Sequence, residues 1–140
     1  MKITTDKFGE IEYEESAVIS FTDGILGFPD SKRYILLNAD EDSPFKWLQS
    51  VDEAETAFLL IDPTIFRPDY EAKLDANTTA DLSITSKDDY VVFVIVVVNA
   101  DPTMSTANLL GPIILNIKNQ SASQIVLNNL EYSTRHPLVG

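Results

Sequence analysis

One run of nine apolar residues constrains the fold of this chain more than any other feature. The run, YVVFVIVVV at residues 90–98, shows no alternation of apolar and polar side chains. Its many β-branched residues and the flanking Asp89 and Asn99 argue against a helix, because branching at Cβ restricts side-chain rotamers there. A strand with this pattern is typically covered on both faces. We therefore predict that residues 90–98 form the central strand of a sheet.

Further strand signals predict a mostly β fold. Segments rich in Val, Ile, Phe and Tyr lie between Asp, Asn, Gly and Pro residues, a pattern typical of strands and turns. The predicted strands are ITT, EIEYEESAVISF, RYILLN, TAFLLID, NLLGPIILNI and QIVLN. Gly111 and Pro112 interrupt one of them, because proline cannot donate to a neighbouring strand, and predict an edge, a bulge or a bend. We expect a single-domain, strongly curved antiparallel sheet that closes toward a small β-barrel.

Only two segments favour a helix, and both are short. After Ser43 and Pro44, the spacing of Phe45, Leu48 and Asp52 suits one or two helical turns, and Trp47 lies four residues before Val51. Trp47 and Leu48 of this helix are expected to pack on the sheet. A second helix is expected within DANTTADLSIT, which takes its apolar contacts from Leu74, Leu82 and Ile84. Neither segment divides the chain, so we expect one domain over residues 1–140.

Composition excludes several classes of function. The chain has no cysteine, which removes disulfides, thiolate metal sites and cysteine nucleophiles. Its 22 acidic and 10 basic residues give a net charge of −12, and the isoelectric point is near 4.2. Such a charge repels nucleic acid and anionic membranes and attracts basic proteins, although it also serves simple solubility. We expect a cytoplasmic protein without direct contact to nucleic acid or membrane.

No residue pattern points to catalysis, a metal or a cofactor. His136 is the single histidine, and it has no partner histidine to share a metal. Gly24 and Gly27 lack the context of a phosphate-binding loop and are interpreted as turn glycines. Asp88 and Asp89 are interpreted as a solvated turn before the central strand. The chain is therefore expected not to be an enzyme.

The segment DPTIFRPDY at residues 62–70 has two interpretations. Its prolines and aromatic residues suit a rigid loop that places Phe66 and Tyr70 in the core. Alternatively, the same rigidity suits a shaped docking loop for a partner.

Four stretches, taken in order, carry a family resemblance. They are DGILGFPDSKRYILL at 23–37, SPFKWLQSVDEAETAFLLIDP at 43–63, RPDYEAKL at 67–74 and TANLLGPIILNIKNQSASQIVL at 106–127. Together they resemble the flagellar assembly factor FliW family over nearly the whole chain. The sequence departs from the family at Leu26, where proline is frequent, and at Gly111, where alanine is common.

The resemblance implies a non-enzymatic regulator that switches between two partners. FliW-like proteins bind the translational repressor CsrA, a small basic RNA-binding dimer, and so relieve repression of flagellin synthesis. They also bind flagellin, the filament subunit, before its export. The alternative is a flagellin-specific cytoplasmic chaperone without CsrA control, which would hold its client by strand addition at an exposed edge.

Candidate partner-binding residues follow from charge and from apolar patterning. The alternation at residues 10–15 puts Ile11 and Tyr13 on one face of a strand and an acidic stripe on the other. We expect the basic partner to contact this stripe together with two acids of the PDYE loop: Glu10, Glu12, Glu14, Asp69 and Glu71. For flagellin the candidate is an apolar edge around Leu109, Leu110 and Ile113, with burial in the core as the alternative. Trp47 is expected to anchor the scaffold, or else an interface.

Overall fold

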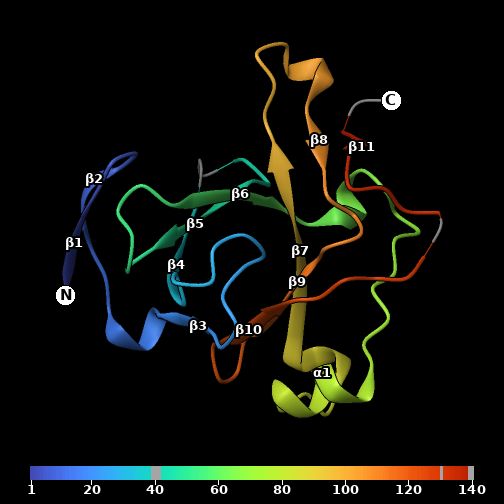
Figure 1. Cartoon of the computed structure of the whole chain (residues 1–140), viewed down its shortest axis with the longest axis horizontal. Helices are drawn as coiled ribbons and strands as arrows, with labels where there is room; N and C mark the ends of the chain where they lie inside the picture. The colour runs from blue at the N-terminus through green and yellow to red at the C-terminus, as the bar shows by residue number, and fades with distance from the viewer. Residues whose placement is uncertain (39–41, 130, 139–140) are drawn as a thin grey trace.

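The computed structural model describes residues 1–38, 42–129 and 131–138, and within these ranges seven strands close into a barrel (Figure 1). Their order around the barrel is β7, β6, β5, β4, β3, β10 and β9, and β9 pairs again with β7. The strands are β3 (Ile19–Phe21), β4 (Arg33–Asn38), β5 (Lys46–Ser50), β6 (Ala57–Ile61), β7 (Tyr90–Val97), β9 (Ile113–Asn116) and β10 (Ser121–Gln124). The predicted curved sheet is confirmed, except that β3 and β10 run parallel.

Smaller elements surround the barrel. β1 (Lys2–Thr5) and β2 (Gly9–Glu12) form a separate antiparallel hairpin. β8 (Thr106–Ala107) and β11 (His136–Pro137) continue the large sheet beyond β7. The helix α1 (Ala76–Asp81) lies within DANTTADLSIT, as predicted, and Asp75 caps it by accepting a hydrogen bond from the Thr78 N–H. The 3₁₀ turns are η1 (Glu15–Ala17), η2 (Pro63–Ile65), η3 (Lys87–Asp89) and η4 (Pro102–Met104).

The barrel encloses the first of two apolar cores. Its buried members are Ile19, Phe21, Ile25, Tyr34, Leu48, Leu60, Phe93, Ile113, Leu115 and Ala122. The central position of β7 is confirmed, since this strand pairs with β6, β8 and β9. The prediction that both faces of β7 are covered along its whole length is wrong. Val97 is 65% exposed, because this end of β7 extends beyond the barrel as an arm with β8 (Figure 1).

A second core covers the outer face of β6 and β7. Ile61, Val94 and Val96 form its floor. The loop after β6 and the C-terminal segment cover this floor, and Tyr70 and Tyr132 stack within the cover with ring centroids 4.7 Å apart. The Tyr70 hydroxyl donates a hydrogen bond to the Leu109 carbonyl at 2.7 Å, which fixes the loop after β6 to the segment before β9. This confirms the rigid-loop interpretation, with Tyr70 buried and Phe66 half-buried against the same core.

The expected helix around Trp47 is wrong, because these residues form β5. β4 and β6 pair with the two edges of this strand, and that pairing outweighs the helical spacing of its apolar residues. Leu48 is 1% exposed and faces the barrel interior, whereas Trp47 lies on the outer face. There the Trp47 ring meets Phe8 edge-on at 5.7 Å, and Lys7 Nζ lies 4.4 Å from its centroid. Trp47 thus fixes the N-terminal hairpin to the barrel.

Two other local predictions change, and two are confirmed. The expected strand EIEYEESAVISF is divided by η1, and only Gln124 of QIVLN belongs to β10. Gly111 and Pro112 form the expected break, immediately before β9. The turn glycines are confirmed: Gly24 has φ +69°, and a Cβ there would lie 2.7 Å from the Phe28 carbonyl oxygen.

Asp89 is buried, so its interpretation as part of a solvated turn is wrong. Its side chain accepts hydrogen bonds from the Thr85 N–H, the Thr85 hydroxyl and the Ser86 N–H. Lys118, from the turn after β9, brings its Nζ within 2.7 Å of the second carboxylate oxygen. The Lys118 hydrogen bond and those from Thr85 hold the pKa of Asp89 well below its usual range.

This carboxylate should make the stability of the fold dependent on pH. Because the folded-state pKa of Asp89 lies below the unfolded value, its contribution is complete above about pH 4 and is lost as the pH falls further. We expect Asp89→Asn to lower the melting temperature at pH 7 and to differ less from the unchanged protein near pH 2. Thermal melts across this range measure the difference, with Asp88→Asn as the control. A difference that stays constant with pH would contradict the role of Asp89.

Candidate functional site

The acidic stripe lies on the N-terminal hairpin and just after it. Glu10, Glu12 and Glu14 are exposed, while Ile11 is half-buried on the other face of β2. Lys2 reduces the charge of this stripe, since its Nζ lies 3.6 Å from Glu10 and its backbone pairs in register with Glu12. An exposed pair of this kind contributes little stability, so the stripe remains free to exchange partners.

The two acids of the PDYE loop lie elsewhere. Asp69 is exposed and forms an ion pair with Arg67, whose Nε lies 3.2 Å away. Glu71 is exposed, and its backbone N–H donates to the Tyr132 hydroxyl at 2.9 Å. Figure 1 places the β1–β2 hairpin and this loop at opposite ends of the longest axis. The structure therefore does not bring the five predicted acids into one surface.

Further acids join the hairpin end, and sequence reasoning missed them. The Asp6 N–H donates to the Ala54 carbonyl at 3.1 Å, which docks the hairpin on the turn between β5 and β6. Asp6 and Glu55 are both exposed at this junction. The signal was the acid-rich string VDEAET at 51–56, but its proximity to the hairpin depends on a contact between distant segments. We call Asp6, Glu10, Glu12, Glu14 and Glu55 the acidic end.

The proposed apolar edge is not exposed in this structure. Leu109 is 0% exposed and belongs to the second core, while Ile113 is 2% exposed and lies inside the barrel. Leu110 is half-buried against the second core. These side chains are buried or half-buried, which is the alternative stated from the sequence. The reason is that the chain on both sides of the break at Gly111 faces a core.

An exposed apolar surface does exist, at the place where the cover over the second core stops. A groove of about 470 Å³ lies between η2, the β7–β8 arm and the C-terminal segment. Its lining includes Phe45, Leu59, Phe66 and Leu138. At its rim, Ile65 and Val98 are 55% and 62% exposed, which is unusual for such residues on two neighbouring segments. We call this surface the apolar groove.

Fixed negative charge flanks the apolar groove. Asp62 caps η2, and its carboxylate accepts from the N–H and the hydroxyl of Thr64. Asp101 caps η4 in the same way through Thr103, and these hydrogen bonds lower the pKa of Asp101. The His136 ring packs against Phe66 at 5.6 Å, and burial lowers the pKa of His136, which keeps it uncharged at neutral pH. Asp62 and Asp101 each adjoin in sequence a residue that lines the groove, Ile61 and Pro102.

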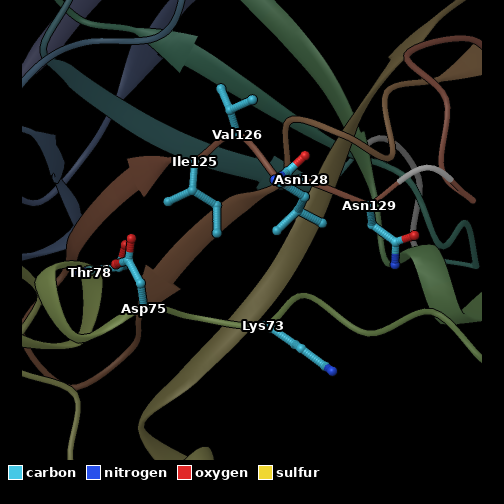
Figure 2. A pocket seen from close by; sticks show the side chains of 8 residues that line it. Lys73, Asp75, Thr78, Ile125, Val126, Asn128 and Asn129 are labelled. Carbon is cyan, nitrogen blue, oxygen red and sulfur yellow. Dashed lines mark hydrogen bonds between the residues drawn. The ribbon is translucent and has the colours of Figure 1, made fainter.

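A hollow of about 530 Å³ lies between residues 73–78 and 125–129 (Figure 2). Lys73 points away from it, while the Asp75 carboxylate is engaged with Thr78 at the start of α1. Among the described residues, no group of three or more His, Cys, Asp or Glu side chains is placed to hold a metal ion. None of the helices in the described ranges is long and apolar enough to cross a membrane.

Comparisons with known proteins match the chain almost from end to end. The family model described as FliW protein matches residues 2–138. The chain belongs to the FliW family. It is 41% identical over 139 residues to the flagellar assembly factor FliW of Syntrophus aciditrophicus, covering 99% of this chain and 88% of the relative. It is 43% identical over 137 residues to that of Geobacter sulfurreducens, covering 98% of this chain and 86% of the relative.

A solved FliW structure has the same fold. The crystal structure of the flagellar assembly factor FliW superposes with a TM-score of 0.94 at 38% identity, and the match covers 100% of this chain and 98% of that one. The FliW resemblance expected from the four sequence stretches is therefore confirmed. The stretch PFKWLQS corresponds to β5 and its approach, so Trp47 carries a scaffold contact in this FliW fold.

Proposed function

We propose that this FliW-family protein is a non-enzymatic regulator of flagellar assembly that exchanges CsrA for flagellin. The observation that carries the proposal is the family match over residues 2–138, because the relatives are named flagellar assembly factors. Flagellin that accumulates in the cell would occupy the protein and release CsrA, and export of flagellin would reverse the exchange by mass action.

The acidic end is the proposed contact for CsrA. A net charge of −12 supports attraction of a small basic dimer, and the exposed carboxylates of this end are concentrated on one hairpin and the turn beneath it. Complementary charge raises the association rate more than the affinity, so added salt should slow binding. Asp69 and Glu71 stay candidates for a second, separate contact.

The apolar groove is the proposed contact for flagellin, in place of the buried edge at Leu109. A filament subunit exposes, before assembly, apolar side chains that the filament later covers, and such side chains suit an uncovered part of a core. The rim residues Ile65 and Val98 are accessible to them without any rearrangement of the barrel.

The exchange is tested by calorimetric titration with CsrA from the same organism, first alone and then after saturation with flagellin. We expect binding in the first titration and its loss in the second. A Glu12→Lys, Glu14→Lys variant should bind CsrA more weakly and with a smaller dependence on salt, because both residues are exposed and their reversal leaves the fold intact. Simultaneous binding of both partners without mutual weakening would overturn the switch.

The apolar groove also favours the chaperone alternative. A protein that shields an apolar client segment needs such a surface and needs no contact with CsrA. Absence of CsrA binding in the first titration, together with flagellin kept soluble by the purified protein, would select this alternative.

A further inference from the structure

Strand β10 has an edge that the barrel leaves unpaired beyond Ala122. β3 pairs with β10 only at Ser121 and Ala122, because the chain turns away after Phe21. Past the end of β10, Ile125 and Leu127 donate their N–H groups to the carbonyls of Pro112 and Leu110, at 3.0 and 2.8 Å. This alternate bonding continues the antiparallel ladder with β9 through residue 127.

The residues between these donors face the other way. In such a ladder, the N–H and C=O groups of Val126 and Asn128 point to the edge that β3 has left. Neither backbone has a hydrogen-bond partner within residues 1–38, 42–129 and 131–138, and Val126 is 72% exposed. Charged side chains and prolines commonly protect strand edges, but QIVLN at 124–128 contains neither. This edge is open to another strand.

Side chains on either side of the edge indicate what kind of strand it accepts. The Leu26 N–H donates to Gln124 Oε1 at 2.9 Å, which places the loop after β3 beside β10, as Figure 1 also shows. Leu26 is 63% exposed, so with Val126 it offers apolar contact along the open edge. A bound segment would therefore carry apolar side chains at this end.

The other end of the edge is acidic. A hollow of about 330 Å³ lies beside Ala122 and Ser123 and is lined by Asp23 and Asp81. Both carboxylates are exposed, and neither has an ion-pair partner among the residues that the structure describes. No basic side chain lines the hollow, so it complements a cation.

We propose that the open edge of residues 122–128 binds an extended segment of a partner protein by strand addition. The segment carries Lys or Arg next to Asp23 and Asp81 and apolar side chains next to Leu26 and Val126. Main-chain hydrogen bonds to Val126 and Asn128 supply the register, while the flanking side chains supply the selectivity. This site is separate from the apolar groove and the acidic end, and it stands whether or not those surfaces bind flagellin and CsrA.

The test uses two blocked peptides, Lys-Lys-Thr-Val-Thr-Val-Thr and its reverse, because the edge accepts either strand direction. Each is titrated to about millimolar concentration into the ¹⁵N-labelled full chain, and amide exchange is followed by NMR. We expect one peptide to shift the amide signals of Val126 and Asn128 and to slow their exchange. The same peptide with Glu in place of both Lys residues should bind more weakly.

Val126→Pro is the decisive variant. Proline removes one edge donor and suits an extended backbone, and the lost N–H has no role in the fold itself. We expect the folded variant, verified by its amide spectrum, to bind the peptide about tenfold more weakly. Asp23→Asn with Asp81→Asn should remove the preference for Lys over Glu. Equal affinity of Val126→Pro and the unchanged protein, or no protection of Val126 and Asn128 by either peptide, would overturn the proposal.

Discussion

We expect the Val98→Asp variant to bind flagellin about ten- to a hundredfold more weakly than the unchanged protein. Val98 is 62% exposed at the rim of the apolar groove, so an aspartate there is hydrated in the free protein and leaves the fold intact. When an apolar segment covers the groove, the same carboxylate loses its water without gaining a partner. Calorimetric titration with flagellin measures the loss.

Two further measurements make this result specific to the groove. Ile117→Asp adds the same charge at a position that is 50% exposed outside the groove, and it should leave flagellin affinity unchanged. CsrA binding by Val98→Asp should also be unchanged, because the acidic end lies on other elements. Equal flagellin affinity of Val98→Asp and the unchanged protein would move the flagellin contact away from the groove.

Leu48→Ala should lower the free energy of unfolding by about 2–5 kcal/mol, because the side chain is 1% exposed inside the barrel and its removal leaves a cavity. The neighbouring Trp47→Ala should cost less, about 1–2 kcal/mol, since it removes an edge-on aromatic contact and a cation over the ring from a half-buried position. Urea denaturation of both variants compares the two faces of β5.

The two substitutions should also speed amide exchange in different parts of the fold. Trp47→Ala should speed amide exchange in the β1–β2 hairpin, which packs on that ring through Phe8. Leu48→Ala should speed exchange across the barrel strands instead. A Trp47→Ala variant that is less stable than Leu48→Ala, or that keeps the hairpin amides protected, would contradict the assignment of Trp47 as the hairpin anchor.

Local sequence patterns predicted most of the strands, and the reason is physical. RYILLN and TAFLLID combine β-favouring residues with polar ends, and both formed strands within a residue or two of the expected bounds. The segment at Phe45–Leu48 failed because apolar residues at a spacing of three also occur on a strand whose two faces are both covered. Only the pairing with β4 and β6 distinguishes the two cases.

The candidate surfaces were harder to predict because they join distant segments. The apolar groove brings Leu59, Val98 and Leu138 together, and no local pattern relates these residues. Asp89 was expected in solvent because its partner Lys118 comes from another turn. The exposure of Glu10 and Glu12, by contrast, followed from simple alternation along β2, because the apolar Ile11 between them lies on the other face.

The closure of the barrel has a consequence for how the chain acquires its shape during synthesis. β3, near the start, pairs with β10, near the end, and β7 completes the ring through β9. Pairings between such distant segments pay a large loop-closure entropy and fold slowly. The barrel therefore cannot close until residues 113–124 have left the ribosome. The groove is complete only when Leu138 has followed them. A nascent chain thus lacks the complete lining of the groove until residue 138 has been synthesised.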